Sequence, residues 1–231
     1  MTVLLLRLAG PLQAWGAASR FAYRHTEIAP TKSGVIGLLA AARGMRRTEP
    51  LTDLLGLTFG VRIDQPGQIL RDFQVARSLD GRRNMPLTYR YYLSDAAFLA
   101  AVDGDENLLQ GLHEALNRPR FPLYLGRRSC PPAGRVCLGV HTGGIADALS
   151  TWPWQASKRH RQQAARTVQL EILRDAGPDD HTVETIRDEP VTFDPAHRQH
   201  AWRPIVRSNT LLENPESRST VSHDPMALLG G

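Results

Sequence analysis

Lysine is almost absent from this 231-residue chain. Arginine supplies all but two of its 28 basic residues, and the two lysines are Lys32 and Lys158. Against 23 acidic residues, the formal net charge is +5 and the pI is near 9.7. The guanidinium group binds phosphates and base edges through paired hydrogen bonds, so this inventory favours a polyanionic partner. A GC-rich genome produces the same bias without any function, and both explanations stay open.

Cysteine is also scarce. Cys130 and Cys137 are too few for a disulfide framework, and their spacing is not that of a zinc ribbon or a redox CxxC pair. The eight histidines are dispersed, and only His197 and His200 lie close together, without a nearby ligand set. We therefore expect no metal and no other cofactor.

Long apolar runs are missing. The run from Val3 to Leu6 ends at Arg7, so it lacks the hydrophobic core of a signal peptide. No other stretch approaches the roughly 18 apolar residues of a membrane span. With 42% hydrophobic and 22% charged residues, the composition is that of a globular protein and excludes disorder as the main state. We expect a soluble, cytoplasmic protein with no membrane partner.

The positive charge is concentrated in the first part of the chain. Residues 1–135 hold 18 basic and 11 acidic residues, a net charge of +7, whereas residues 136–231 hold 10 and 12, a net charge of −2. A site for an anion is therefore expected in the first part.

The order of predicted elements indicates an α+β fold. An apolar strand at residues 3–9 is closed by Gly10-Pro11, and a helix capped by Thr31 or Ser33 ends at Gly44. Residues 57–63 and 71–76 predict a hairpin around Asp64-Gln65-Pro66-Gly67. A strand at 88–102, a helix at 106–117 and a strand at 136–140 follow. This order is close to βαββαβ, the ferredoxin-like (RRM/RAMP-type) plan with two helices on one face of an antiparallel sheet.

Three regions follow from this pattern. Residues 1–141 are predicted to form the ferredoxin-like domain, with a basic loop or ribbon at 78–87 that projects from it. Residues 142–209 are predicted to form a small β-rich region, with strands at 167–173, 183–186, 191–193 and 205–206. Residues 210–231 read as a flexible tail.

The first candidate binding segment follows the first strand. Gln13, Trp15 and Gly16 precede a mixture of rings and cations, namely Arg20, Phe21, Tyr23, Arg24 and His25. Single-stranded RNA is bound by such mixtures, because bases stack on rings while arginines contact phosphates. The alternative is that Trp15 and Phe21 fill the edge of the core.

Two further segments predict anion sites. At the helix start, Lys32, Ser33 and Gly34 would offer backbone N–H groups and an ammonium group to a phosphate, although, taken alone, this segment favours an ordinary capped helix. Residues 118–135 contain five arginines and no acid. Within them, Gly126 permits a positive φ and a close backbone approach, and the Arg127-Arg128-Ser129 segment offers a double set of donors.

Catalytic patterns are thin. The chain has no GxSxG, HExxH or paired-carboxylate motif. A metal-free RNA cleavage site assembled from scattered His, Tyr and Lys residues stays open.

Three motifs in order carry a family resemblance: LRLAGPLQAWG, PTKSGVIGLLAA and YLGRRSCP. RDFQVARS, TYRYYLSDAAF, the DEP at Asp188–Pro190 and Trp202 keep the same order and spacing. Over about residues 2–207 the chain resembles the CasD family, the RAMP-type subunit that holds the crRNA 5′ handle in the type I-E CRISPR Cascade complex.

The resemblance implies a fold and a role. It implies a ferredoxin-like fold with a protruding β-hairpin thumb at about residues 77–90. One copy would cap the crRNA 5′ end and join the large subunit to the backbone subunits, contacting target DNA only indirectly, through the complex. Such a subunit is non-catalytic. The related type I-C subunit is a nuclease with a Tyr, Lys and His group, and Tyr23, Lys32 and His25 lie near that region, so a metal-independent endoribonuclease is the alternative.

The resemblance also implies handle-binding positions that coincide with those chosen from the residues: Gln13, Trp15, Gly16, Lys32, Ser33, Gly34, Gly126, Arg127, Arg128 and Ser129. Charge and location alone add Arg24, Arg77, Arg82, Arg83 and Arg90.

Overall fold

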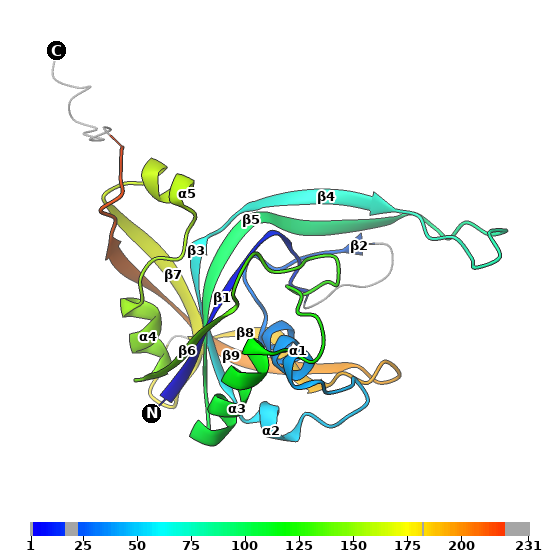
Figure 1. Ribbon diagram of the computed structural model, residues 1–231, viewed down its shortest axis with the longest axis horizontal. Helices are drawn as coiled ribbons and strands as arrows, with labels where there is room; N and C mark the ends of the chain where they lie inside the picture. The colour runs from blue at the N-terminus through cyan, green and yellow to red at the C-terminus, as the bar shows by residue number, and fades with distance from the viewer. Residues whose placement is uncertain (1, 17–22, 182, 220–231) are drawn as a thin grey trace, which may run out of the picture.

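A single nine-stranded sheet organises the protein. The computed structural model describes residues 2–16, 23–181 and 183–219 (Figure 1). The strand order is β6-β1-β5-β3-β7-β9-β8, and β2 and β4 also pair with β5. All pairings are antiparallel except that of β2 with β5. The strands are β1 (Thr2–Gln13), β2 (Tyr23–Arg24), β3 (Thr58–Gln65), β4 (Gln68–Gln74), β5 (Thr88–Asp103), β6 (Cys137–Thr142), β7 (Thr167–Asp175), β8 (Glu184–Thr192) and β9 (Gln199–Glu213).

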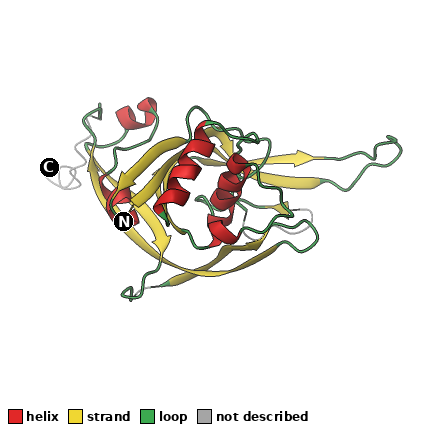
Figure 2. Ribbon diagram, turned by 60° about the horizontal axis from the view of Figure 1, so that its bottom comes forward, coloured by secondary structure: helices red, strands yellow, loops and turns green. Residues whose placement is uncertain are grey.

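Helices cover both faces of the sheet. Those in the described residues are α1 (Lys32–Arg43), α2 (Thr52–Leu55), α3 (Glu106–Asn117), α4 (Ile145–Thr151) and α5 (Lys158–Gln163). Figure 2 shows α1 and α3 side by side on one face. Leu4, Leu6 and Leu8 of β1 are buried in the core on that face, and Val3 and Leu5 in a second cluster with α4. Burial on both sides explains why β1 reads as a continuous apolar run. The mixed α/β class with a mainly antiparallel sheet is confirmed.

The two long helices lie where the sequence predicts them. Thr31 caps α1, accepting a hydrogen bond from the Gly34 amide (3.2 Å), and Gly44 ends it in the left-handed conformation with φ 81°. The α3 helix spans the predicted residues, and Asp105 caps it through the Leu108 amide (3.0 Å). The short helices α2, α4 and α5 were not predicted.

The hairpin predicted around Asp64–Gly67 is wrong. Both strands pair with β5 instead of with each other. β3 pairs with the second half of β5 and β4 pairs with the first half of β5, where Gln68 lies opposite Ser94. The chain therefore passes Pro66 without reversing. Gly67 makes this possible, because it has φ 71° and a Cβ there would lie 2.5 Å from the Ser94 carbonyl oxygen.

A two-stranded ribbon projects from the body. It comprises β4, the first half of β5 and the tip at residues 75–87, and we call it the β4–β5 ribbon (Figure 1). At its tip, Arg77 and Asn84 form an isolated antiparallel bridge.

The C-terminal strands extend the same sheet. β7 pairs with β3, β9 pairs with β7, and β8 forms the edge. Residues 183–186 and 191–193, predicted as two strands, are spanned largely by the single strand β8. β9 continues to Glu213, so the start predicted for the tail, residue 210, is too early. Residues 220–231 lie outside the described part of the chain. The domain boundary predicted between residues 141 and 142 stays a prediction. Strands from both sides of it belong to the same sheet.

Two smaller points complete the fold. β1 does not stop at Gly10-Pro11 but pairs with β5 as far as Gln13, because Pro11 is exposed at a position that needs no ladder hydrogen bond. Among the described residues, no helix is long and apolar enough to cross a membrane.

Candidate nucleic-acid interface

Four rings form a stacked surface at the base of the β4–β5 ribbon. Tyr23 stacks on Tyr89 (centroids 5.3 Å apart, planes at 14°), and His25 stacks on Tyr91 (5.0 Å, 16°). Tyr23 and His25 are themselves parallel at 6.3 Å. We call these four residues the aromatic ladder. Because Tyr89 and Tyr91 are two residues apart on a strand, both rings point to the same face of β5.

The neighbouring strand β4 adds a cation and another ring to this face. Phe73 lies opposite Tyr89 and Arg71 lies opposite Tyr91, so all four share one face of the ribbon. The Arg71 guanidinium lies over the Tyr89 ring, 5.4 Å from its centroid. Phe73 is 67% exposed, and Tyr23 is 51% exposed. Exposed rings beside a guanidinium offer stacking surfaces for unpaired bases and a partner for their phosphates.

The Arg127 side chain fastens the acid-free loop to this surface. It donates to the Tyr91 carbonyl (3.1 Å) and to the Arg24 carbonyl (2.7 Å), and its guanidinium lies over the Tyr92 ring at 4.7 Å. All of these partners belong to β5 or β2. Arg127 is a positioning residue, which holds β2 and the loop against β5.

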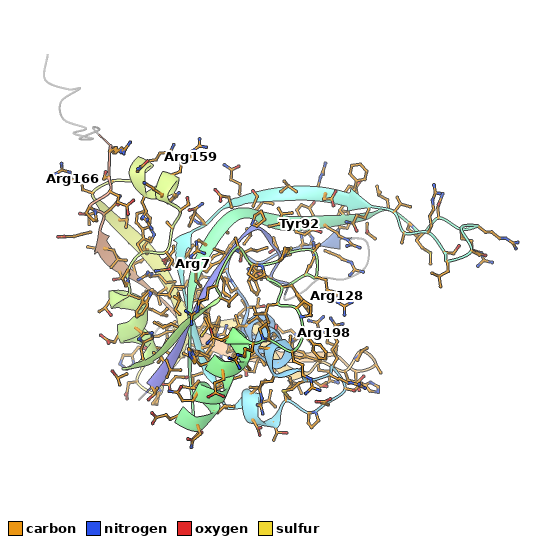
Figure 3. All side chains as sticks on the ribbon, viewed as in Figure 1. Arg7, Tyr92, Arg128, Arg159, Arg166 and Arg198 are labelled. Atoms are coloured by element: carbon orange, nitrogen blue, oxygen red, sulfur yellow. The ribbon has the colours of Figure 1, made fainter. Side chains whose placement is uncertain are left out.

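The rest of the predicted loop divides into a buried and an exposed part. Gly126 has φ 84°, and a Cβ on it would lie 1.8 Å from the Ala14 carbonyl oxygen. The positive φ and close approach predicted for Gly126 are confirmed, and the backbone that approaches it is the chain's own. Arg128 and Ser129 are exposed, and Figure 3 shows Arg128 below the ribbon.

Gln13 and Trp15 are not available to stack on a base, because both side chains are fully buried. The Gln13 amide donates to the carbonyls of Leu8 (3.1 Å) and Ala96 (2.8 Å) and accepts from the Trp15 indole (3.0 Å). Trp15 therefore fills the edge of the core, as the alternative expected, and a handle-binding role of the Gln13 and Trp15 positions stays a prediction. Gly16 is exposed beside them; Arg20 and Phe21 lie outside the described residues.

The predicted phosphate site at the start of α1 is already occupied by the protein's own carboxylates. The Lys32 amide donates to Asp188 (2.8 Å), and the Lys32 ammonium pairs with Asp175 (3.2 Å) and Glu189 (2.8 Å). Ser33 is buried, and the Gly34 amide is used by the Thr31 cap. The charge and the amides that predicted an anion site at Lys32, Ser33 and Gly34 are thus satisfied internally in this structure, and a handle-binding role of these three residues stays a prediction.

The remaining predicted cations lie along the ribbon. Arg77, Arg82 and Arg83 are exposed at its tip, where the Arg82 amide donates to Asp80 (3.1 Å). A hydrogen bond from Ser78 and this amide lower the pKa of Asp80. Nearer the body, Arg24 of β2 is exposed opposite the half-buried Arg90 of β5.

Sequence reasoning missed the residues that build the stacked surface, because neither Tyr89, Tyr91, Arg71 nor Phe73 was predicted as a site residue. The signal was present in Thr88-Tyr-Arg-Tyr-Tyr92, where a period of two puts Tyr89 and Tyr91 on one face. What the sequence could not show is that Tyr23 of β2 and the adjacent His25, more than 60 positions earlier, lie beside them.

One titratable group lies next to the ladder. Partial burial and the nearby Asp188 raise the pKa of Glu27, and His25 opposes this shift. The Glu27 amide also donates to the Trp15 carbonyl (2.5 Å), which anchors the segment that carries His25. Among the described residues, no three His, Cys, Asp or Glu side chains gather as metal ligands.

Known proteins show the same architecture. The family model described as CRISPR-associated protein (Cas_Cas5) matches residues 3–206. The CRISPR system Cascade subunit CasD of Escherichia coli (strain K12) is 36% identical over 158 residues, which cover 59% of this chain and 70% of that protein.

Two solved structures are similar over almost the whole chain. A chain of a CRISPR RNA-guided surveillance complex matches with a TM-score of 0.75 at 32% identity, covering 94% of this chain and 93% of that one. A second, described as the crystal structure of Cas protein, matches with a TM-score of 0.68 at 36% identity, covering 93% and 97%. The resemblance inferred from the three motifs is confirmed: the chain belongs to the Cas5 family of CRISPR-associated proteins, as a CasD-type member.

Proposed function

We propose that this protein is a non-catalytic subunit of a Cascade surveillance complex and binds the 5′ handle of crRNA on the ribbon face that carries the aromatic ladder. The observation that supports this most is the ladder itself, flanked by Arg71 and by the exposed Arg128. Stacking contributes about 1–3 kcal/mol per base, and phosphate contacts add a salt-dependent term.

The fold supports the same role. The order β6-β1-β5-β3, with α1 and α3 on one face, is the strand order of a ferredoxin-like βαββαβ domain. We take the β4–β5 ribbon as the thumb of a RAMP-type protein. Its exposed arginines at the tip would follow the RNA backbone.

Other Cascade subunits are the proposed protein partners. The large subunit and the backbone subunits would contact this chain, which would link them, and target DNA would be reached through the assembled complex.

The test is the affinity of the purified chain for a labelled single-stranded handle RNA. Tyr89→Ala with Tyr91→Ala should weaken binding at least tenfold, because two stacking surfaces are removed. Trp202→Ala is the matched control: Trp202 is 66% exposed on β9 and lies outside the ladder, so its removal should leave affinity unchanged. Equal affinity of the ladder variant and the control would reject the proposed interface.

A second function, metal-independent cleavage of repeat RNA, is favoured by one observation. His25 lies in the ladder within electrostatic reach of Glu27, whose pKa is raised, and such a pair can exchange a proton with RNA. A group made of Tyr23, Lys32 and His25 is less suitable, since two carboxylates hold the Lys32 ammonium.

Incubating labelled repeat RNA with the protein in EDTA separates the two functions. We expect intact RNA. One specific cut that disappears in His25→Ala would establish the endoribonuclease instead.

A further inference from the structure

A second group of cations lies on the side of the molecule where the β8–β9 turn meets the end of α1. Arg47 follows α1, and Arg187 lies on β8. Arg198 directly precedes β9, and His200 is the second residue of β9. The Arg187 guanidinium donates to the His200 carbonyl (3.2 Å), and the Phe193 ring lies 6.5 Å from the His200 ring. The end of α1 and the β8–β9 pair, which are far apart in the sequence, thus bring four basic side chains together.

These cations lack the acidic partners that other arginines of the same strands have. Arg203 pairs with Asp188 (2.7 Å), and Arg207 pairs with Glu171 (2.6 Å) and Glu184 (2.8 Å). Within the described residues, Arg47, Arg187 and Arg198 form no salt bridge. Their charges remain available to an external anion.

The charges of this group lie within electrostatic reach of one another. Burial and the nearby Arg47 lower the pKa of Arg198, while Tyr124 opposes this shift. Burial, Arg198 and Arg187 lower the pKa of His200, and Asp188 opposes this. The three arginines are exposed and His200 is half-buried, and an anion bound between these like charges would reduce their mutual repulsion.

One polar atom also points to a missing ligand. The Nδ1 atom of His200 is buried and has no hydrogen-bond partner among the described residues. Leaving a buried polar atom without a partner is unfavourable, so such atoms are usually satisfied by a ligand or by water.

We propose that Arg47, Arg187, Arg198 and His200 form a second binding site, whose ligand is a phosphate group. This inference rests on the proposed function in one respect: the phosphate is taken to belong to the RNA bound at the ribbon. Tyr124, which lies close to Arg198, leads into the loop that carries Arg128, and Figure 3 shows Arg128 and Arg198 on the same side of the molecule. The RNA would therefore run from the ladder past Arg128 to this cluster.

Salt titrations of handle RNA binding test the site. Arg47→Gln with Arg198→Gln should weaken affinity at least fivefold and reduce the slope of log affinity against log salt by about 0.7 for each phosphate that the variant no longer binds. The matched control is Arg207→Gln, which also removes a charge from β9, but one already held by two carboxylates.

The ladder variants separate this inference from the proposed function. In one outcome, Tyr89→Ala with Tyr91→Ala weakens binding and leaves the slope of log affinity against log salt unchanged, while the arginine variant behaves like the control. That outcome rejects the second site and supports the ladder as the RNA-binding surface. If neither variant changes affinity, the proposed interface itself fails.

A second measurement identifies the source of the phosphate. His200 faces Arg198, Arg187 and Asp188, and a bound phosphate would stabilise its protonated form. NMR titration should therefore show a raised pKa of His200 with handle RNA, and no rise in the arginine variant. A rise with inorganic phosphate alone supports a site that also takes free phosphate. No rise with either probe overturns the proposal.

Discussion

Two glycines with nearly equal backbone angles separate the effect of strain from that of a clash. Gly126 has φ 84° and Gly134 has φ 86°. A Cβ at Gly126 would lie 1.8 Å from the Ala14 carbonyl oxygen, whereas a Cβ at Gly134 would meet nothing within 4 Å.

Gly134→Ala should lower the free energy of unfolding by about 1–2 kcal/mol, the cost of a left-handed residue with a side chain. Gly126→Ala should lower it by about 3 kcal/mol or more, since Ala14 and the end of β1 must also move. Urea denaturation measures both. Equal decreases would mean that the loop can shift away from β1 at no cost.

Arg127 and Arg128 are adjacent but differ in role. Arg127 uses its donors on the Tyr91 and Arg24 carbonyls, whereas Arg128 is exposed. Arg128→Ala should therefore reduce the slope of log RNA affinity against log salt by the contribution of about one phosphate contact. The melting temperature of the protein should stay unchanged.

Arg127→Ala should lower both the melting temperature and RNA affinity, because β2 is then no longer attached to the loop. Circular dichroism and a salt titration on both variants check this. Identical behaviour of the two variants in both measurements would contradict the division of roles.

At the scale of the element, α1 is joined to the C-terminal strands through its first residue. The Lys32 side chain is only 7% exposed and bridges Asp175 of β7 and Glu189 of β8. Arg203 of β9 holds Asp175 and Asp188 in the same network.

The two lysines of the chain form a matched pair of variants. Lys32→Ala should lower the free energy of unfolding by about 1–3 kcal/mol, because Glu189 loses its partner and Asp175 keeps only Arg203 as a cationic partner. Lys158 is exposed on α5, and Lys158→Ala should change it by less than about 0.5 kcal/mol. Chemical denaturation decides, and a Lys32 variant as stable as the Lys158 variant would show that the network contributes little.

Local patterns predicted the elements well, because the physics of capping and periodicity is local. Thr31, Gly44 and the apolar spacing of α1 and α3 lie within the elements they define. The hairpin at Pro66-Gly67 failed because its alternative, both strands pairing with β5, depends on a strand more than 20 residues later. The internal partner of the Lys32 amide was invisible for the same kind of reason, since Asp188 lies 156 positions away.

At the scale of the molecule, the two predicted regions share their hydrophobic core. Leu149 of α4 and Ile172 of β7 are buried with Val3, Leu5 and Leu99 in one cluster. The sheet is hydrogen-bonded across β3 and β7.

The chain should therefore unfold in one cooperative transition. A variant that keeps only Trp15 reports on the first region, and one that keeps only Trp154 reports on the second, since both indoles are buried. In each variant, the urea midpoint measured by fluorescence should equal the midpoint measured by circular dichroism. Distinct midpoints would instead make 141/142 a boundary between two folding units.

One strand, β5, belongs both to the core and to the ribbon. Its second half is enclosed between β1 and β3, while its first half pairs with β4 outside the body. A change in length at residues 75–87 adds or removes pairs only at the outer end and leaves the register of the enclosed half untouched. The reach of the ribbon can therefore diverge between related proteins, by insertion or deletion at its tip, while the sheet beneath it keeps its form.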